Sequence, residues 1–207
     1  MLVIKESDAT ALEIACDFLK RGKIISFATD TVYGIGVDAS NSKAVENLYE
    51  IKNREKNKPI AIFLKNLTKA KKIFFFNDLS LKIAEEFLPG SITLVLKTLP
   101  KPLSSLTSTL NQNDDGFLGF RIIKRDFIEK LLEKFDGNLA VTSANQSGKN
   151  AALSADEIKN YFKSSEIDLL IDGGTSKTNI ASTVVKINEK NITILRQGIV
   201  DMTSYLK

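Results

Sequence analysis

The chain has 207 residues, of which 43% are hydrophobic, and this is enough apolar side chain for one substantial core. It contains no histidine, which excludes Ser-His-Asp catalysis, HExxH zinc sites and imidazole acid-base chemistry. A single cysteine, Cys16, excludes an internal disulfide and a multi-cysteine metal site. The net charge of +4 favours an anionic partner, so a nucleotide-dependent enzyme and an RNA-binding module both stay open.

Hydrophobic periodicity predicts alternating helices and strands from the N-terminus onward. Residues 7–21 have cap-type residues at the start and apolar residues at helical spacing, with Gly22 directly after them, so we predict an amphipathic helix. Residues 23–28 predict a strand, and residues 42–54 predict a second helix that is capped by Ser42. Further helices are predicted at 80–88, 125–135 and 155–163, and further strands at 59–64, 91–97, 117–123, 138–143, 168–173, 181–187 and 192–196.

The order of these elements predicts an α/β fold. Helices fall between most of the strands, which is typical of a twisted sheet with helices packed against it. The last two strands surround a polar turn at 188–191, so they predict a hairpin and make the sheet mixed. We therefore expect a single domain over residues 1–207, with an open twisted mixed sheet and flanking helices. No stretch reaches the roughly 18 consecutive apolar residues of a membrane span, so we expect a cytoplasmic protein without a membrane partner.

The segment TDTVYG, residues 29–34, combines hydroxyls, an acid, an aromatic ring and a glycine directly after a predicted strand. We predict a loop that leads to the next helix, because open α/β sheets bind ligands where strands end. Tyr33 would offer a flat wall, and Gly34 and Gly36 would let the backbone approach a ligand closely. The alternative is an ordinary turn in which Asp30 and the threonines only satisfy loop amides.

Cations alternate with other residues in KNREKNK, just past the second predicted helix. On an extended segment, alternate side chains project to one side, so these cations would line one groove suited to a phosphate chain. The alternative is a solvated run of charge. The four cations are Lys52, Arg54, Lys56 and Lys58.

Polar or charged residues also mark three other predicted strands. The strand at 138–143 runs into SANQSG, in which Ser143 and Asn145 can hydrogen-bond phosphate or ribose oxygens. Arg121 stands inside the otherwise apolar FLGFRII, and an arginine embedded in a strand needs an anionic partner. That partner is either a structural carboxylate or a substrate carboxylate. Arg196 in ILRQG repeats the pattern.

Taken in order, these motifs resemble the YrdC/TsaC family of threonylcarbamoyl-AMP synthases. The set consists of TDTVYGIG, KNR followed by KPI, PGSITLVL, FRI, TSANQSG, STVV and ILRQG, and it covers nearly the whole chain. The resemblance implies a YrdC-like domain that joins L-threonine, bicarbonate or CO2, and ATP into threonylcarbamoyl-AMP and pyrophosphate. It also implies Mg2+ bound with ATP, by unknown ligands, and delivery of the product to a threonylcarbamoyl transferase complex that makes the t6A modification of tRNA.

The resemblance further implies roles for individual residues. Lys52 and Arg54 would be catalytic, and Arg121 would bind the carboxylate of threonine. The nucleotide site would include Arg54, Lys58, Ser143, Asn145, Ala151 and Arg196, and the threonine site would include Thr31, Tyr33, Arg121, Val141 and Ser182.

The sequence departs from the family pattern at several positions. Some relatives have a polar residue in place of Phe63 and a serine in place of Ala151, so contacts there would be apolar or from the backbone. Lys186 stands where the family pattern has an acid, and Ile123 where relatives often have proline. The chain ends soon after ILRQG, which is typical of the short form without an extra C-terminal domain.

Two other functions stay open. One is an RNA-binding module without catalysis, whose basic concave surface would bind tRNA or double-stranded RNA. The other is a carbamoyl-transfer domain like those within hydrogenase-maturation proteins. The synthase and the RNA-binding module both predict affinity for RNA, but only the enzyme requires Arg121 to face a small pocket.

Overall fold

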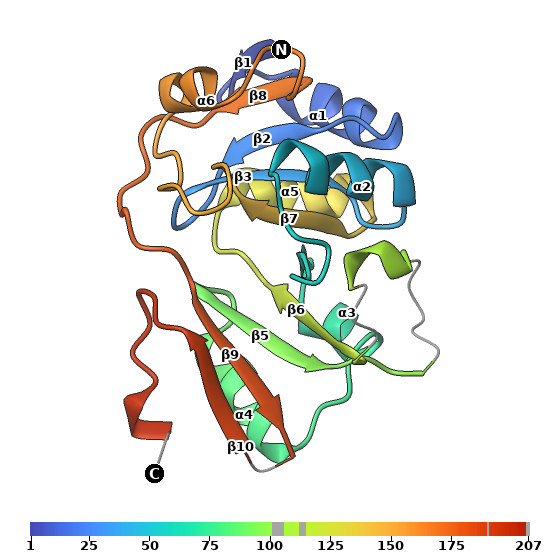
Figure 1. Ribbon diagram of the computed structural model, residues 1–207, viewed down its shortest axis with the longest axis vertical. Coiled ribbons are helices and arrows are strands. Elements are labelled where there is room, and N and C mark those ends of the chain that lie inside the picture. Colours follow the sequence, from blue (N-terminus) through green and yellow to red (C-terminus); the bar gives the residue numbers. More distant parts are fainter. Residues whose placement is uncertain (101–105, 112–114, 190, 206–207) are drawn as a thin grey trace.

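The computed structural model describes residues 1–100, 106–111, 115–189 and 191–205. Its strands are β1 (Leu2–Lys5), β2 (Ile25–Ala28), β3 (Tyr33–Asp38), β4 (Ala61–Phe63), β5 (Ile92–Lys97), β6 (Phe117–Arg121), β7 (Leu139–Ser143), β8 (Leu169–Asp172), β9 (Thr183–Asn188) and β10 (Asn191–Arg196). They form one sheet in the order β1-β8-β2-β3-β7-β4-β6-β5-β9-β10 (Figure 1). The sheet is mixed, because β2 and β8 pair in parallel whereas β2 and β3 pair antiparallel.

Helices pack on both faces of this sheet, so the predicted α/β fold with a mixed sheet and flanking helices is confirmed (Figure 1). They are α1 (Ala11–Lys20), α2 (Ser42–Ile51), α3 (Leu67–Lys71), α4 (Asp78–Phe87), α5 (Asp126–Phe135) and α6 (Ala155–Tyr161), with short 3-10 turns η1 (Ser108–Leu110) and η2 (Thr203–Tyr205). One apolar cluster joins α1 and α5 to β2, β7 and β8, and includes Leu19, Phe27 and Leu131. A second cluster joins α2, α4 and α6 to the opposite face, and includes Leu48 and Ile83.

Side-chain hydrogen bonds move the starts of three predicted helices. The Asp8 carboxylate accepts from the backbone N–H and the hydroxyl of Thr10, so the first helix begins only at Ala11. The cap of α2 is Asn41 rather than the predicted Ser42, because its side chain accepts from the N–H of Ala44. The helix predicted from residue 80 begins at Asp78, after the capping residue Asn77.

The prediction for residues 29–34 was wrong in one respect. They form a tight turn that enters β3, antiparallel to β2 with Tyr33 opposite Ala28, and not a loop that leads directly to a helix. The strand was not predicted because it contains Gly34 and Gly36, and glycine is uncommon inside strands. A Cβ atom at either position would lie 3.1 Å from a methyl carbon of Val141 on β7, so the glycines let β3 lie beside that side chain.

The predicted C-terminal hairpin is confirmed, since β9 and β10 pair antiparallel with Ile187 opposite Ile192. Its strand β9 pairs in parallel with β5, which places the hairpin next to β5 and β6. The strand β1, which the sequence did not predict, forms the other edge of the sheet. None of the helices in the described ranges combines the length and the apolar character needed to cross a membrane.

Candidate active site

A cavity of about 560 Å³ lies on one face of the sheet. Helices α1 and α5 cover this face over β2, β7 and β8. Beyond these helices the same face is the cavity floor, which is formed by residues 33–34 of β3, by residues 141–143 of β7 and by alternate residues of β4, β5, β6 and β9. Floor residues include Gly34 on β3, Val141 on β7, Gly119 on β6, Thr93 on β5 and Val184 on β9.

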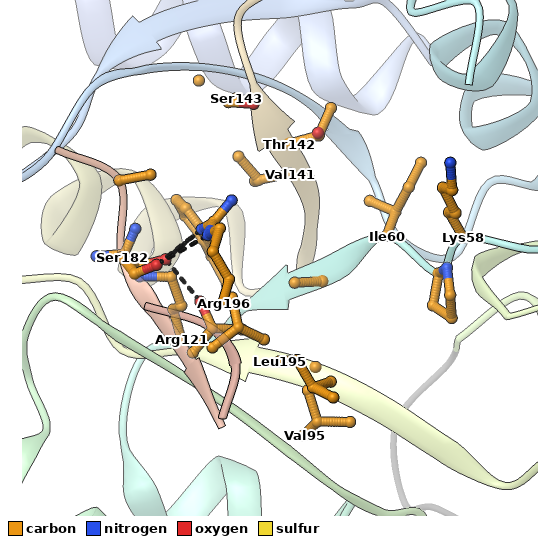
Figure 2. Close-up of a pocket in the computed structure, with 18 of the residues that line it drawn as sticks. Lys58, Ile60, Val95, Arg121, Val141, Thr142, Ser143, Ser182, Leu195 and Arg196 are labelled. Carbon is orange, nitrogen blue, oxygen red and sulfur yellow. Dashed lines mark hydrogen bonds between the residues drawn. The ribbon is translucent and has the colours of Figure 1, made fainter. Parts of the chain in front are cut away.

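Arg54 and Arg196 line this cavity and donate, in the described part of the chain, only to carbonyl and hydroxyl oxygens. Arg54 follows α2, and its Nε and Nη2 donate to the carbonyl oxygens of Lys58 and Pro59, both at 2.9 Å. Arg196 ends β10, and its Nε and Nη2 donate to the carbonyl oxygen of Ser182 at 3.1 and 2.8 Å (Figure 2). Burial lowers the pKa of Arg196, and the positive charge of Arg54 lowers it further. Two arginines that repel each other across a cavity suit an anion that carries several charges.

Arg121 lines the same cavity but has a carboxylate partner. Its Nη2 donates to both oxygens of Asp30, at 2.7 and 2.9 Å, and to the carbonyl oxygen of Gly90 at 3.2 Å. A structural carboxylate, one of the two partners that the sequence allowed, is therefore present. The buried Nε has no hydrogen-bond partner among the residues that the structure describes, and Nη1 has a long contact of 3.4 Å to the hydroxyl of Thr31. Part of the guanidinium thus lacks a close acceptor in the described part of the chain.

Lys52, Ser143 and Asn145 form one hydrogen-bonded cluster at the end of β7. The Lys52 ammonium donates to the carbonyl oxygen of Ser143 at 2.6 Å and to Oδ1 of Asn145 at 2.5 Å. The Ser143 hydroxyl donates to the same Oδ1 at 2.7 Å. Of the three, Ser143 lines the cavity, whereas Lys52 and Asn145 lie outside its lining. Lys52 therefore supports the residue that faces the cavity, and it is itself only 2% exposed.

The predicted alternation of four cations along one groove was wrong. Asn53 has a left-handed φ of 46°, so the chain turns after α2 instead of extending. Lys52, the C-cap of α2 before this turn, reaches the end of β7, whereas Arg54, after the turn, donates to Pro59. Lys58 lines the cavity while its ammonium pairs with Glu55 at 3.0 Å. The exposed Lys56 lies outside the lining.

Burial, and secondarily the charge of Arg54, lower the pKa of Lys52 from 10.5 to about 7. At pH 8 the free protein therefore holds most of this amine neutral. A polyanion bound beside Arg54 favours the charged form and raises this pKa, so binding of ATP at pH 8 should take up a proton. At pH 5.5 the amine is already protonated, and the uptake should vanish.

Calorimetric titration with ATP in two buffers of different ionisation enthalpy measures this uptake. We expect buffer-dependent heats at pH 8 that are lost in Lys52→Met and kept in Lys56→Met, which removes an exposed lysine next to the same turn. Identical heats in both buffers for the unaltered protein would contradict the assignment.

The structure also brings the residues expected around threonine to the cavity. Thr31, Tyr33, Val141 and Ser182 all line it. The Tyr33 hydroxyl is directed away to the turn after β8, where it donates to the carbonyl oxygen of Gly174 at 2.7 Å, and burial raises the pKa of this phenol to about 12. The predicted wall is not borne out, because the ring is fully buried in the apolar cluster on the opposite face of the sheet, and this phenol offers no acid-base chemistry near neutral pH.

Ala151, by contrast, lies outside the cavity lining. It belongs to the loop after β7, whose end is fixed by a bond from the N–H of Ala152 to the carbonyl oxygen of Ala144 at 2.8 Å. Because alanine has no polar side-chain group, any contact with a nucleotide would come from its backbone.

Several cavity residues were not predicted from the sequence, and Thr93 and Lys186 are two of the polar ones. The Thr93 hydroxyl on β5 lies 2.9 Å from the hydroxyl of Ser182, although 89 positions separate them in the chain. The ammonium of Lys186 lies 3.9 Å above the ring of Phe117, and it is 3.6 Å from a carboxylate oxygen of Asp115. Alternation along each strand could show that Thr93 on β5 and Lys186 on β9 point to one face of the sheet. It could not show that these two strands are neighbours.

A sequence model of the Sua5_yciO_yrdC family, described as telomere recombination, matches residues 17–198. The chain belongs to this family. A family member from Methanocaldococcus jannaschii, named as a candidate threonylcarbamoyl-AMP synthase, is 37% identical over 89% of this chain and 86% of its own length. The threonylcarbamoyl-AMP synthase of Pyrococcus abyssi is 31% identical over 90% of this chain. This chain covers 54% of the Pyrococcus protein, so it spans about half of that relative.

A solved structure of the same family resembles this fold. The crystal structure of Pyrococcus abyssi Sua5 complexed with L-threonine has a TM-score of 0.85 and 28% sequence identity, over 95% of this chain and 57% of that chain. The likeness extends over both the helix-covered strands and the strands that form the cavity floor.

Proposed function

We propose that this Sua5/YciO/YrdC family member is a threonylcarbamoyl-AMP synthase, a nucleotidyltransferase that forms L-threonylcarbamoyladenylate and pyrophosphate from L-threonine, bicarbonate or CO2, and ATP. The observation that carries the proposal is the cavity itself. Among the described residues, two of its arginines form no ion pair with an acid, which suits a triphosphate, and a third has a donor without an acceptor, which suits a carboxylate. The names of the relatives support the same reaction.

The proposed chemistry needs no histidine. The threonine amine adds to CO2 and loses a proton to water, which gives a carbamate. A carbamate oxygen then attacks the α-phosphorus of ATP, and the bond to the β-phosphate oxygen breaks to release pyrophosphate. Because the nucleophile is already an anion, the protein has mainly to hold the reactants in line and to stabilise charge on the phosphates. Arg54, Lys58 and Arg196 would supply that charge, and Ser143, which lines the cavity, would be their polar neighbour at the end of β7.

In this proposal Mg2+ binds together with ATP, as the Mg-ATP complex. No group of three or more acidic or cysteine side chains within the described ranges is placed to hold a metal ion. Mg2+ that is bound mainly by nucleotide phosphates and water needs few protein ligands. In this proposal the metal would arrive with ATP, and its role would be to neutralise phosphate charge.

The adenylate product would pass to a threonylcarbamoyl transferase complex for t6A formation in tRNA, and a cytoplasmic location suits that route. Weak affinity for tRNA or double-stranded RNA is compatible with the net charge of +4. An RNA-binding module does not need the small cavity that Arg121 lines. A carbamoyl-transfer domain stays the other alternative, and the names of the relatives favour the synthase over it.

Release of pyrophosphate tests the proposal directly. We expect pyrophosphate from ATP only when threonine and bicarbonate are both present, because the carbamate is the nucleophile. A coupled pyrophosphate assay with each substrate omitted in turn measures this dependence. ATP cleavage that is indifferent to threonine would refute the function.

A further inference from the structure

Asp30 pairs with Arg121 from outside the cavity lining. Both of its carboxylate oxygens accept from Arg121 Nη2, and Oδ2 also accepts from the hydroxyl of Ser91 at 2.9 Å. The side chains of Asp30 and Arg121 are 10% and 7% exposed, so water screens this ion pair little. Asp30 therefore fixes the arginine without reaching the ligand space itself.

This arrangement leaves a defined part of Arg121 for a ligand. Its Nε is a buried donor without a partner among the described residues, and Nη1 makes only the 3.4 Å contact to Thr31. A buried donor that lacks an acceptor is unfavourable, so a ligand oxygen that reaches it is stabilised. Because Asp30 occupies Nη2 alone, one guanidinium can bind the structural acid and a ligand oxygen at the same time.

The three cavity arginines consequently differ in net charge. Arg121 and Asp30 together are neutral, whereas Arg54 and Arg196 donate, among the described residues, only to carbonyl and hydroxyl oxygens, and the acid near Arg54, Glu55, pairs with Lys58. A triphosphate is attracted more strongly to the uncompensated pair, because the Coulomb energy scales with the product of the charges. A zwitterionic amino acid has no net charge, so it loses little by binding to the neutral pair through hydrogen bonds.

We infer that Asp30 is a specificity-determining positioning residue: it orients Arg121 toward the amino-acid carboxylate and, by neutralising it, keeps phosphate groups at Arg54 and Arg196. This inference rests on the proposed function, whose substrates place a carboxylate and a triphosphate in one cavity. Asp30 is thereby the residue that separates two anionic groups which would otherwise compete for the same kind of side chain.

Asp30→Asn tests this role, because it keeps the size of the side chain and removes its charge. We expect the KM for threonine to rise about tenfold, the KM for ATP to change less than about twofold, and inorganic phosphate to become a competitor of threonine. Glu6→Gln is the matched control. Glu6 pairs with Arg125 at 2.7 Å, half-buried and outside this cavity, so its loss should lower Tm without changing the KM for threonine or creating inhibition by phosphate.

Direct titration with inorganic phosphate gives a readout that does not depend on activity. Asp30→Asn should bind phosphate at least about tenfold more tightly than the unaltered protein, and the further change Arg121→Gln should abolish the gain. If the unaltered protein made no pyrophosphate with threonine, the proposed function would fail, and this titration would still decide the role of Asp30. A lower Tm with unchanged threonine KM and phosphate affinity would make Asp30 a scaffold residue and overturn the inference.

Ser91→Ala is a second variant in case Asp30→Asn does not fold. It removes the hydrogen bond from the Ser91 hydroxyl to Asp30 and leaves every charge in place. We expect the KM for threonine to rise about two- to threefold, because Asp30 loses one hydrogen bond that holds it in place, and the KM for ATP to stay the same. No rise in that KM would also overturn the inference.

Discussion

Arg54→Ala should lower kcat/KM for ATP about 100-fold and leave the affinity for threonine within about twofold. A charge-assisted hydrogen bond to phosphate contributes about 1.5–3 kcal/mol, and each 1.4 kcal/mol is a factor of ten. Arg54 also donates to the carbonyl oxygens of Lys58 and Pro59, so its loss releases the turn that carries a second cation. The loss of kcat/KM for ATP should therefore be at least as large as the loss of one charge-assisted hydrogen bond would cause.

Two measurements check this result. Steady-state pyrophosphate formation gives kcat/KM for ATP, and calorimetric titration with ATP and with threonine gives the two affinities separately. Arg21→Ala is the control, because Arg21 is 61% exposed, pairs with Asp17 on α1 and does not line the cavity. It should change neither affinity. Normal ATP affinity and turnover in Arg54→Ala would remove Arg54 from the nucleotide site.

Arg121→Lys should raise the KM for threonine about 10- to 100-fold and lower Tm by about 2–8 °C. A guanidinium can bind Asp30 through Nη2 and still present Nε to a ligand, whereas an ammonium is a point charge on a flexible stem. The lysine would remain with Asp30, because that carboxylate is buried and would otherwise lack a charge partner. Threonine would then lose its partner, and the weaker ion pair would lower stability.

The KM and the Tm together separate a substrate-binding role from a structural one. Arg125→Lys is the matched control, since Arg125 pairs with Glu6 and also donates to a backbone carbonyl, at Gly173, outside the cavity. We expect this control to lose stability and to keep normal threonine kinetics. If Arg121→Lys behaved in the same way, Arg121 would be a scaffold residue and the threonine carboxylate would bind elsewhere.

Patterns of short range in the sequence determined much of this protein. Apolar residues at helical spacing located α1 and α5 to within a few residues, and β-rich runs located β5 and the C-terminal hairpin. The ordered motifs led to the family, and the absence of histidine restricted the chemistry to charge and positioning. These features are local because a helix or strand face is set by neighbours in the chain.

The tertiary structure decided which side chains meet. Gly34 and Gly36 belong to a strand because the Val141 side chain on β7 fills the space beside them. Lys52 meets the end of β7 from the end of α2, and the left-handed backbone of Asn53 sends Arg54 in another direction. Asp30 and Arg121 are 91 positions apart, and only the packing of β6 against the turn after β2 makes them an ion pair. A sequence pattern specifies the face on which a side chain lies, whereas its partner is chosen by the order and twist of the strands across the sheet.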